Sequence, residues 1–371
     1  MVQPAASSAA DFGMTVDYAS LNGFCAELLR RAGLCEADAR LGADVLATTD
    51  AWGVFTHGTK LMRGYLKRLL AGGLKPRGRP AVVAEGGAWA VVDGDSALGM
   101  VTSVFAMRTA MAKARANGIG YSGVRNTCHF GAAGYYSVLA AKEGLVGLCM
   151  ANDLPSVAAP GSRGAVTGTN PISYAIPSGR YRPMFLDMSI ATVAGGKVYA
   201  AKERGEPVPD TWLIGADGRP TTDPSRYPSA GALAPAAGHK GYGLALLIET
   251  LSGVLTGAGF TWGVRSWMTD DPALPTNHGA AFLAIDCDAL MPSGEFASRM
   301  EKLIDEIHAA PRAAGIERIY VPGEKEWDRY DDAMATGITL PPDVVHSLRE
   351  AAAVFGLDLE RDLVFRAMQD S

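Results

Sequence analysis

A histidine in a short loop between two helix-like segments is the first candidate for chemistry in this sequence. His57 follows Thr56, and Gly53 and Gly58 stand on either side of the pair. Glycine relaxes the backbone at both ends, so the loop can present the two side chains at fixed positions. Imidazole gives or takes a proton near neutral pH, as carbonyl and alcohol chemistry requires. His57 is therefore a candidate general acid and base. The alternative is a histidine that only hydrogen-bonds two helix ends.

A second histidine, His129, lies in a predicted loop at residues 125–131, between a strand and a helix. By itself it is better explained as a buried, hydrogen-bonded histidine than as an active-site group. His278, His308 and His346 fall on predicted turn or helix surfaces, and we assign them no role.

Three loop segments, residues 168–171, 187–189 and 239–241, could build a nucleotide site. The third lies at the predicted N-terminus of a helix, where free N–H groups and the helix dipole favour an anion, and Lys240 adds a full charge. The alternative role for the polar residues of the second segment is to cap the helix that follows.

The glycine motifs of common nucleotide sites are absent. Residues 118–123 match GxGxxG, but a helix precedes the motif and a strand runs through it, the reverse of a Rossmann loop. Residues 195–197 lack the other parts of a P-loop. The sequence has no H-x-x-x-H pattern and no carboxylate cluster, so no metal site is predicted.

Alternating helical and β-prone segments predict an α/β fold with a helical N-terminal lobe and a helical C-terminal segment. The helix over 244–255 is apolar on every side and is expected to be buried all round. Residues 205–237, rich in Pro, Gly and Asp, are expected to form a long surface excursion. Predicted helices are 21–31, 36–49, 61–71, 101–117, 132–143, 192–202, 244–255 and 294–314, and predicted strands are 81–84, 88–92, 119–124, 145–150, 172–176, 184–188, 280–285 and 317–321.

Composition excludes several classes of protein. The 371 residues carry a net charge of −5 from scattered charges, so no basic face is available for nucleic acid. Five well-separated cysteines without a CxxC pair argue against a disulfide framework and fit a reducing cytoplasm. No apolar run is long enough to span a membrane, and residues 1–13 read as a loose tail without a signal peptide.

Taken together, these segments resemble the malate/L-lactate dehydrogenase-like oxidoreductase family, which is distinct from the Rossmann-fold lactate and malate dehydrogenases. The resemblance extends from about residue 37 to residue 324. Its motifs are GVFTHG at 53–58, DGD and LG within 93–99, HFGAAGYY at 129–136, GTNP at 168–171, LDMS at 186–189, GHKG at 238–241 and PGE at 322–324.

The resemblance implies a non-Rossmann NAD(P)-binding fold with a mixed sheet, and a homodimer whose site lies between domains and near the partner subunit. It also implies NAD- or NADP-linked interconversion of a small 2-oxo acid, or of a cyclic imino acid, with its reduced form. The expected domains are a flexible tail at 1–13, a helical lobe at 14–78, a scaffold and dimer domain at 79–120 with 279–371, and a cofactor-binding domain at 121–278.

Residue by residue, the resemblance implies that His57 is the proton donor. The other active-site residues that it implies are Thr56, Thr169, Asp187 and His129, the last of them a substrate-binding residue. The implied cofactor contacts are Asn152, Asp153, Asn170, Asp187, Met188, Ser189, His239, Lys240, Gly241, Gly323, Glu324 and Lys325.

One departure from the family pattern concerns the substrate carboxylate. Relatives usually carry an arginine four residues after the proton-donor histidine, where this chain has Leu61. Arg63 or Lys60 is the nearest cation that could replace it. Two alternatives to a 2-oxo acid dehydrogenase remain open: a C=N reductase of cyclic imino acids on the same fold, and a non-catalytic cofactor-binding protein.

Overall fold

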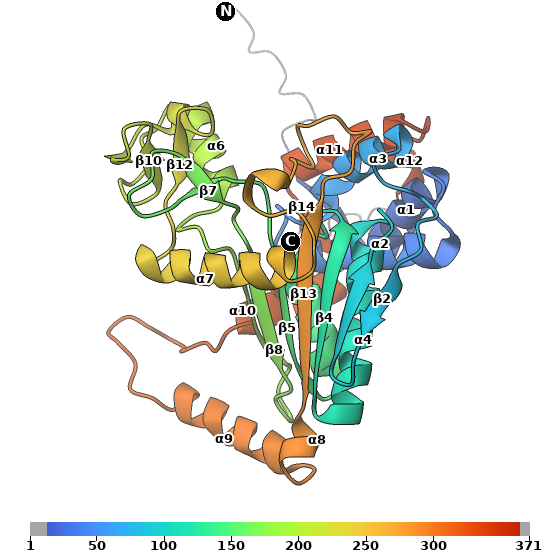
Figure 1. Ribbon diagram of the computed structural model, residues 1–371, viewed down its shortest axis with the longest axis vertical. Helices are drawn as coiled ribbons and strands as arrows, with labels where there is room; N and C mark the ends of the chain where they lie inside the picture. The colour runs from blue at the N-terminus through green and yellow to red at the C-terminus, as the bar shows by residue number, and fades with distance from the viewer. Residues whose placement is uncertain (1–12, 364–371) are drawn as a thin grey trace, which may run out of the picture. The chain divides into compact units, whose positions relative to one another are not determined.

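Figure 1 shows the computed structural model of the chain, which describes residues 13–363. The described residues form two compact units: residues 13–72 with 324–363, and residues 73–323. The predicted tail lies outside the described residues except for Gly13. The four predicted domain ranges stay a prediction.

The first unit is mainly helical. Its elements are β1 Met14–Val16, α1 Tyr18–Arg31, α2 Glu36–Ala51, the 3-10 helix η2 Thr59–Leu61, α3 Met62–Ala71, α10 Glu324–Thr336, β14 Ile338–Leu340, α11 Pro342–Ala353 and α12 Leu359–Asp362. Trp52 and Trp327 pack edge to face, with centroids 5.8 Å apart, and so fix α10 against the end of α2. The C-terminal segment was predicted to be helical, with a turn at Pro341 and Pro342. It contains β14 because β1 supplies an antiparallel neighbour for it.

The second unit is built on a seven-stranded mixed sheet with the order β2-β3-β4-β13-β5-β8-β9. Its strands are β2 Ala81–Glu85, β3 Trp89–Asp93, β4 Ile119–Thr127, β5 Leu145–Ala151, β8 Ile172–Ile176, β9 Met184–Met188 and β13 His278–Asp286. Only β3 and β4 pair in parallel. Helices α4 Gly99–Asn117 and α5 Ala133–Lys142 pack on this sheet. The predicted α/β fold with a mixed sheet is confirmed.

The GxGxxG motif is part of the sheet, as predicted. Strand β4 runs through Gly120 and Gly123. A side-chain carbon at Gly120 would lie 2.1 Å from the carbonyl oxygen of Ala110 in α4. Glycine is therefore needed here for close helix packing and not for a phosphate.

A smaller sheet occupies part of the region that was predicted to be loop. Its strands are β6 Val157–Ala158, β7 Ala165–Thr167, β10 Leu213–Gly215, β11 Pro220–Thr221 and β12 Gly231–Leu233, accompanied by α6 Gly195–Arg204 and the 3-10 helix η3 Pro224–Arg226. Most of residues 205–237 are exposed, as the predicted surface excursion implies, but the segment is not only a loop, because Leu213, Tyr227 and Leu233 are buried in a core of their own. Those apolar residues are too far apart in sequence to form a periodic pattern.

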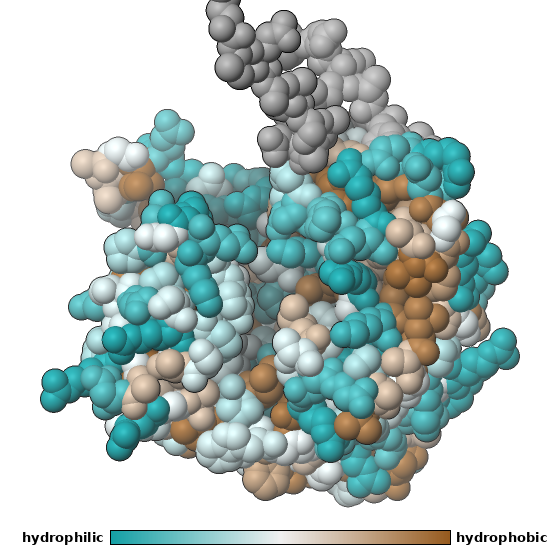
Figure 2. Space-filling view, turned by 90° about the horizontal axis from the view of Figure 1, so that it is seen from above, coloured by the Kyte–Doolittle hydropathy of each residue, from teal (hydrophilic) through white to brown (hydrophobic). Residues whose placement is uncertain are grey.

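Helix α7 His239–Glu249 continues into the π-helix η4 Thr250–Val254. Within the single chain this helix is not buried all round, contrary to the prediction. Ala245 and Ile248 enter a core with residues of the large sheet, whereas Leu244, Leu246 and Leu247 are each more than 40% exposed. Hydrophobic residues also reach the surface elsewhere, as brown patches among hydrophilic ones in Figure 2, but α7 carries a row of them along one helix.

The remaining elements of the second unit are η5 Thr261–Gly263, α8 Cys287–Leu290 and α9 Glu295–His308. Helix α9 ends earlier than predicted, and the predicted strand at 317–321 is an irregular segment. β-Prone residues form a strand only beside another strand, and within residues 13–363 none pairs with this segment.

Candidate active site

The loop that carries His57 leaves α2 through a left-handed turn. Gly53 has φ +78°, which residues with a side chain seldom adopt, and the N–H of His57 then donates to the carbonyl oxygen of Val54 at 3.0 Å. The imidazole is partly exposed, and its Nδ1 lies 3.0 Å from the hydroxyl oxygen of the exposed Thr56. The loop thus presents the two side chains as a pair.

A buried carboxyl group, which the sequence analysis missed, lies beneath this loop. Asp50 is 1% exposed, and its Oδ2 accepts the N–H and the hydroxyl of Thr59 at 3.1 and 2.5 Å. A side-chain carbon at Gly58 would lie 1.8 Å from Oδ1, so only glycine fits after His57. Burial raises the pKa of Asp50 to about 7, against the lowering effect of the bonds from Thr59. The available sequence signal was one acid among small and apolar residues near the end of a helix.

The two cations proposed as substitutes at Leu61 already have partners in the first unit. Lys60 Nζ lies 2.6 Å from Asp343 Oδ2, and Arg63 Nη1 lies 2.8 Å from Glu350 Oε2. Both acids belong to α11. The side chains are well exposed, so each ion pair contributes only about 0–1 kcal/mol to stability. Either cation can therefore be redirected at small cost.

In the second unit, His129 is held against an aromatic wall. Its ring stacks on Trp267, with centroids 4.4 Å apart and planes 17° apart, and its Nδ1 accepts the N–H of Gly131 at 3.3 Å. Because Nδ1 accepts, the proton of the neutral ring stands on Nε2. A side-chain carbon at Gly99 would lie 2.3 Å from the carbonyl oxygen of His129, so glycine lets the start of α4 approach this loop. No sequence pattern pointed to Trp267.

Asp187 lies near the end of β9, with its carboxylate exposed. Its Oδ2 accepts the N–H of Gly134 at 2.7 Å, at the first turn of α5. The capping role considered for Asp187 therefore exists, but for a helix earlier in the chain and not for the one that follows it. Thr169, Met188 and Ser189 are each partly exposed in the same unit.

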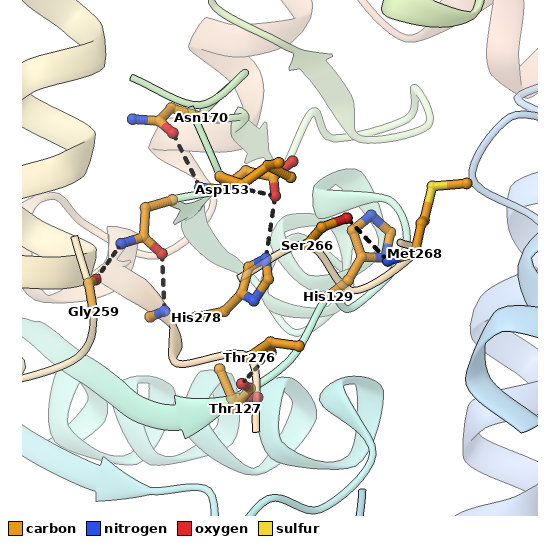
Figure 3. A network of polar contacts seen from close by, with 12 residues as sticks. Thr127, His129, Asp153, Asn170, Gly259, Ser266, Met268, Thr276 and His278 are labelled. Atoms are coloured by element: carbon orange, nitrogen blue, oxygen red, sulfur yellow. Dashed lines mark hydrogen bonds and ion pairs between the residues drawn. The ribbon is translucent and has the colours of Figure 1, made fainter. Parts of the chain in front are cut away.

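The amides of Asn152 and Asn170 are used within the protein, as Figure 3 shows for part of the network. Asn152 accepts the N–H of Gly279 at 2.9 Å and donates to the carbonyl oxygen of Gly259 at 2.7 Å. Asn170 is fully buried and donates to Glu249 Oε2 at 2.6 Å. Both side chains therefore fix neighbouring loops. Glu249, the single acid of an apolar helix, was not singled out from the sequence.

Asp153 is held through one carboxylate oxygen. Its Oδ1 accepts the N–H of Leu154 at 2.8 Å and lies 3.2 Å from Nε2 of His278 (Figure 3). Burial raises the pKa of Asp153, but the bond from His278 and the nearby His129 outweigh it and leave the pKa below its ordinary value. His278 is only 3% exposed, so its predicted surface position was wrong. It starts β13, between strands β4 and β5, and this placement buries it.

The first turn of α7 presents an exposed cation. His239 and Lys240 are both exposed, and Gly241 is buried. A side-chain carbon at Gly241 would lie 2.2 Å from the carbonyl oxygen of Ala236, so the chain before the helix can fold against its first turn only because glycine stands there. A positive side chain and a helix N-terminus together suit a phosphate group.

The last predicted cofactor contacts follow one another at the boundary of the two units. Gly323 ends the second unit with φ +91°, and a side-chain carbon there would lie 2.9 Å from the carbonyl oxygen of Phe185. Glu324 and Lys325 open α10 in the first unit. A backbone this close to β9 requires glycine.

Within residues 13–363, no group of three His, Cys, Asp or Glu side chains is placed to hold a metal ion. No helix in the same part of the chain has both the length and the apolar character needed to cross a membrane.

Comparison with known proteins gives one consistent result. A family model described as malate/L-lactate dehydrogenase matches residues 16–349. The malate dehydrogenase of Pyrococcus abyssi is 35% identical over 344 residues, 91% of this chain and 94% of its own. The ureidoglycolate dehydrogenase (NAD(+)) of Escherichia coli K12 is 32% identical over 90% of this chain and 95% of its own.

A reductase of Δ1-pyrroline-2-carboxylate and Δ1-piperideine-2-carboxylate from Pseudomonas putida is 30% identical over 90% of this chain and 96% of its own. Among solved structures, the sulfolactate dehydrogenase of Methanocaldococcus jannaschii superposes with a TM-score of 0.86 at 34% identity, covering 94% of this chain and 99% of its own.

Proposed function

Since the chain belongs to the malate/L-lactate dehydrogenase family, we propose that it is an NAD- or NADP-dependent oxidoreductase that interconverts a small 2-oxo acid and its 2-hydroxy acid. The family resemblance inferred from the sequence is confirmed. The relatives are dehydrogenases and a reductase, which supports the oxidoreductase class.

The single observation that carries the proposal is the pairing of His57 with Thr56. A hydroxyl can accept a hydrogen bond from a protonated Nδ1 or donate one to a bare Nδ1. His57 therefore keeps this partner whether or not it carries the extra proton. His129 lacks this freedom, because the N–H of Gly131 can only donate to its Nδ1. His57 is thus the better proton donor, and His129 the better hydrogen-bond donor through Nε2.

In the reductive direction, His57 as imidazolium gives its proton to the oxygen that develops negative charge on the substrate C2, and in the oxidative direction it takes that proton back. When bound, NADH or NADPH supplies the hydride for C2. Thr56 hydrogen-bonds the reacting oxygen or orients His57, Thr169 is a further hydrogen-bonding group for the substrate, and Asp187 fixes the start of α5. Arg63, or Lys60, holds the substrate carboxylate through its cationic head.

The residues present fit a dinucleotide. Lys240 and His239 at the first turn of α7 suit its phosphates, and residues 187–189 and 323–325 supply further contacts. Asn152 and Asn170, whose amides are already used, support that site by fixing its loops. Asp153 has an accessible carboxylate and can touch a ligand directly.

A second candidate function is the reduction of a C=N bond in a cyclic imino acid. Two observations favour it: the similarity to the Pseudomonas putida reductase, and a partly exposed carboxylate on Asp153 that can accept a bond from a protonated ring nitrogen. The same two histidines serve either reaction.

We also propose that the active form is a cytoplasmic homodimer. The exposed apolar row on α7 and η4 is a surface that a second copy can cover; it comprises Leu244, Leu246, Leu247, Val254 and Leu255. The cysteines are free thiols, which fits a reducing compartment.

The test is the consumption of nicotinamide absorbance with NADH and NADPH, using a panel of 2-oxo acids beside Δ1-pyrroline-2-carboxylate and Δ1-piperideine-2-carboxylate. His57→Ala should lower turnover by roughly two to four orders of magnitude, the range for removing a general acid, with cofactor affinity nearly unchanged. His346→Ala is the matched control, since His346 lies on the surface of α11 in the same unit.

If no acid or imine is reduced, the chain is a non-catalytic cofactor-binding protein and the proposal fails. Turnover that survives in His57→Ala while cofactor affinity collapses would make His57 a structural residue.

A further inference from the structure

One oxygen of the Asp153 carboxylate has no partner in the protein. Oδ1 accepts the N–H of Leu154 and lies 3.2 Å from Nε2 of His278, whereas no donor to Oδ2 is found among residues 13–363. The side chain is 20% exposed. A partly exposed, charged acceptor without a donor in the described chain is suited to a ligand.

His278 controls which oxygen stays free. It is almost fully buried, and within the described chain its Nδ1 has no hydrogen-bond partner. A proton on Nδ1 would lack an acceptor, so the proton stands on Nε2 and is donated to Asp153. The pair therefore keeps the negative charge of the carboxylate. The bond from the N–H of Asp153 to Asn170 Oδ1, at 3.1 Å, fixes the backbone as well.

The free oxygen belongs to a surface that can bind a small ligand and discriminate between ligands. His129 lies near Asp153, and its ring stacks on the flat face of Trp267. Tyr227 also faces Asp153, but burial raises its pKa to about 12, so it stays neutral. The surface thus combines the free acceptor of Asp153 with two stacked aromatic rings, His129 and Trp267.

We propose that Asp153 is a specificity-determining residue that binds an N–H or O–H donor on the substrate, and that His278 is the residue that positions it. This inference rests on the proposed oxidoreductase function and narrows its substrate class. A hydroxyl, an amide N–H or a protonated ring nitrogen close to C2 is favoured. A second carboxylate or a sulfonate at that place is disfavoured, because it would meet the charge of Asp153.

The test compares kcat/KM for three 2-oxo acids. 3-Hydroxypyruvate carries a hydroxyl group on C3 where 2-oxobutyrate carries a methyl group. Oxaloacetate carries a second carboxylate there and is the dianionic substrate. A hydrogen bond to a charged group corresponds to roughly a tenfold to hundredfold preference for 3-hydroxypyruvate. Asp153→Asn and His278→Leu should bring that preference close to unity. His278→Gln keeps an N–H at a similar reach and should retain most of it.

The far-UV circular dichroism spectrum and the thermal unfolding midpoint of each variant show whether it is folded, and Asp153→Asn carries the test if His278→Leu does not fold. A wild type that prefers 2-oxobutyrate or oxaloacetate overturns the inference, as does a preference that His278→Leu leaves unchanged. In these cases the proposed function stands, because turnover is present. If the wild type reduces none of the acids or imines, both the inference and the proposed oxidoreductase function are refuted.

Discussion

The buried carboxyl group of Asp50 makes the stability of this protein depend on pH in an unusual direction. The pKa of Asp50 is about 7 in the folded chain and about 3.9 in an unfolded one. Between these two values the folded state binds a proton that the unfolded state lacks. The free energy of unfolding therefore falls as pH rises from about 4 to about 7.

The magnitude follows from the difference in pKa. At about 1.4 kcal/mol for each pH unit, about three units correspond to a loss on the order of 4 kcal/mol. Asp50→Asn removes the titration and keeps an oxygen for the two bonds from Thr59. The variant should match the wild type near pH 4 and exceed it at pH 8. Cys25, which also faces Asp50, is buried with a raised pKa and stays neutral throughout this range.

The assay is urea unfolding of both proteins at several pH values from 4.5 to about 8, which spans the expected titration. Asp38→Asn, on the same helix but partly exposed, is the control for loss of a charge. The reasoning is refuted if the difference between Asp50→Asn and wild type is the same at every pH, or if it favours the wild type more strongly as pH rises. Either result would mean that Asp50 is ionised in the folded chain.

Two further predictions concern binding surfaces. Lys240→Ala should weaken NADH or NADPH binding, and the loss of affinity should shrink at high salt, because the proposed contact is a charge on a phosphate at a helix N-terminus. Fluorescence titration at low and high salt measures the affinity. Lys202→Ala on α6 is the control. Leu247→Lys on α7 should yield monomers in sedimentation experiments, whereas Leu70→Lys on α3, where the leucine is at least as exposed, should not. An oligomer that Leu247→Lys leaves unchanged would place the dimer interface elsewhere.

The fold could be predicted from the sequence wherever local pattern decided structure. Strand β5 and helix α4 were each predicted to within two residues, because their apolar residues follow the period of the element. The strands β1 and β14 were missed because each exists only through pairing with the other, across more than 320 residues. Helix α7 shows the converse: composition predicted burial on all sides, but composition does not determine how much of a helix the rest of the chain covers.

The candidate site likewise contains residues that the sequence reveals and residues that only the three-dimensional structure reveals. The segments that carry His57, His129 and Asp187 could be found because they share motifs with a known family. The partners of His129 and Asp153 could not be found in this way, since Trp267 and His278 reach them only through loop packing and strand order. A lone buried acid such as Asp50 leaves a sequence signal, but only the structure shows that its Oδ1 stands against Gly58.

We propose that Arg63, and not Lys60, holds the substrate carboxylate in place of the arginine that relatives carry at Leu61, because the two cations leave different partners behind. Arg63 would give up an exposed ion pair with Glu350, worth about 0–1 kcal/mol, and Glu350 would keep His346 at 3.7 Å. Lys60 would leave Asp343, whose pKa is held below its ordinary value, against the effect of burial, chiefly by that same lysine. Arginine also offers a planar fork that can hold both carboxylate oxygens, which fixes the substrate C2 more firmly than a single ammonium group does. Redirecting Arg63 is thus the less costly change, and the acid left at Glu350 disfavours a substrate with a further negative charge on that side.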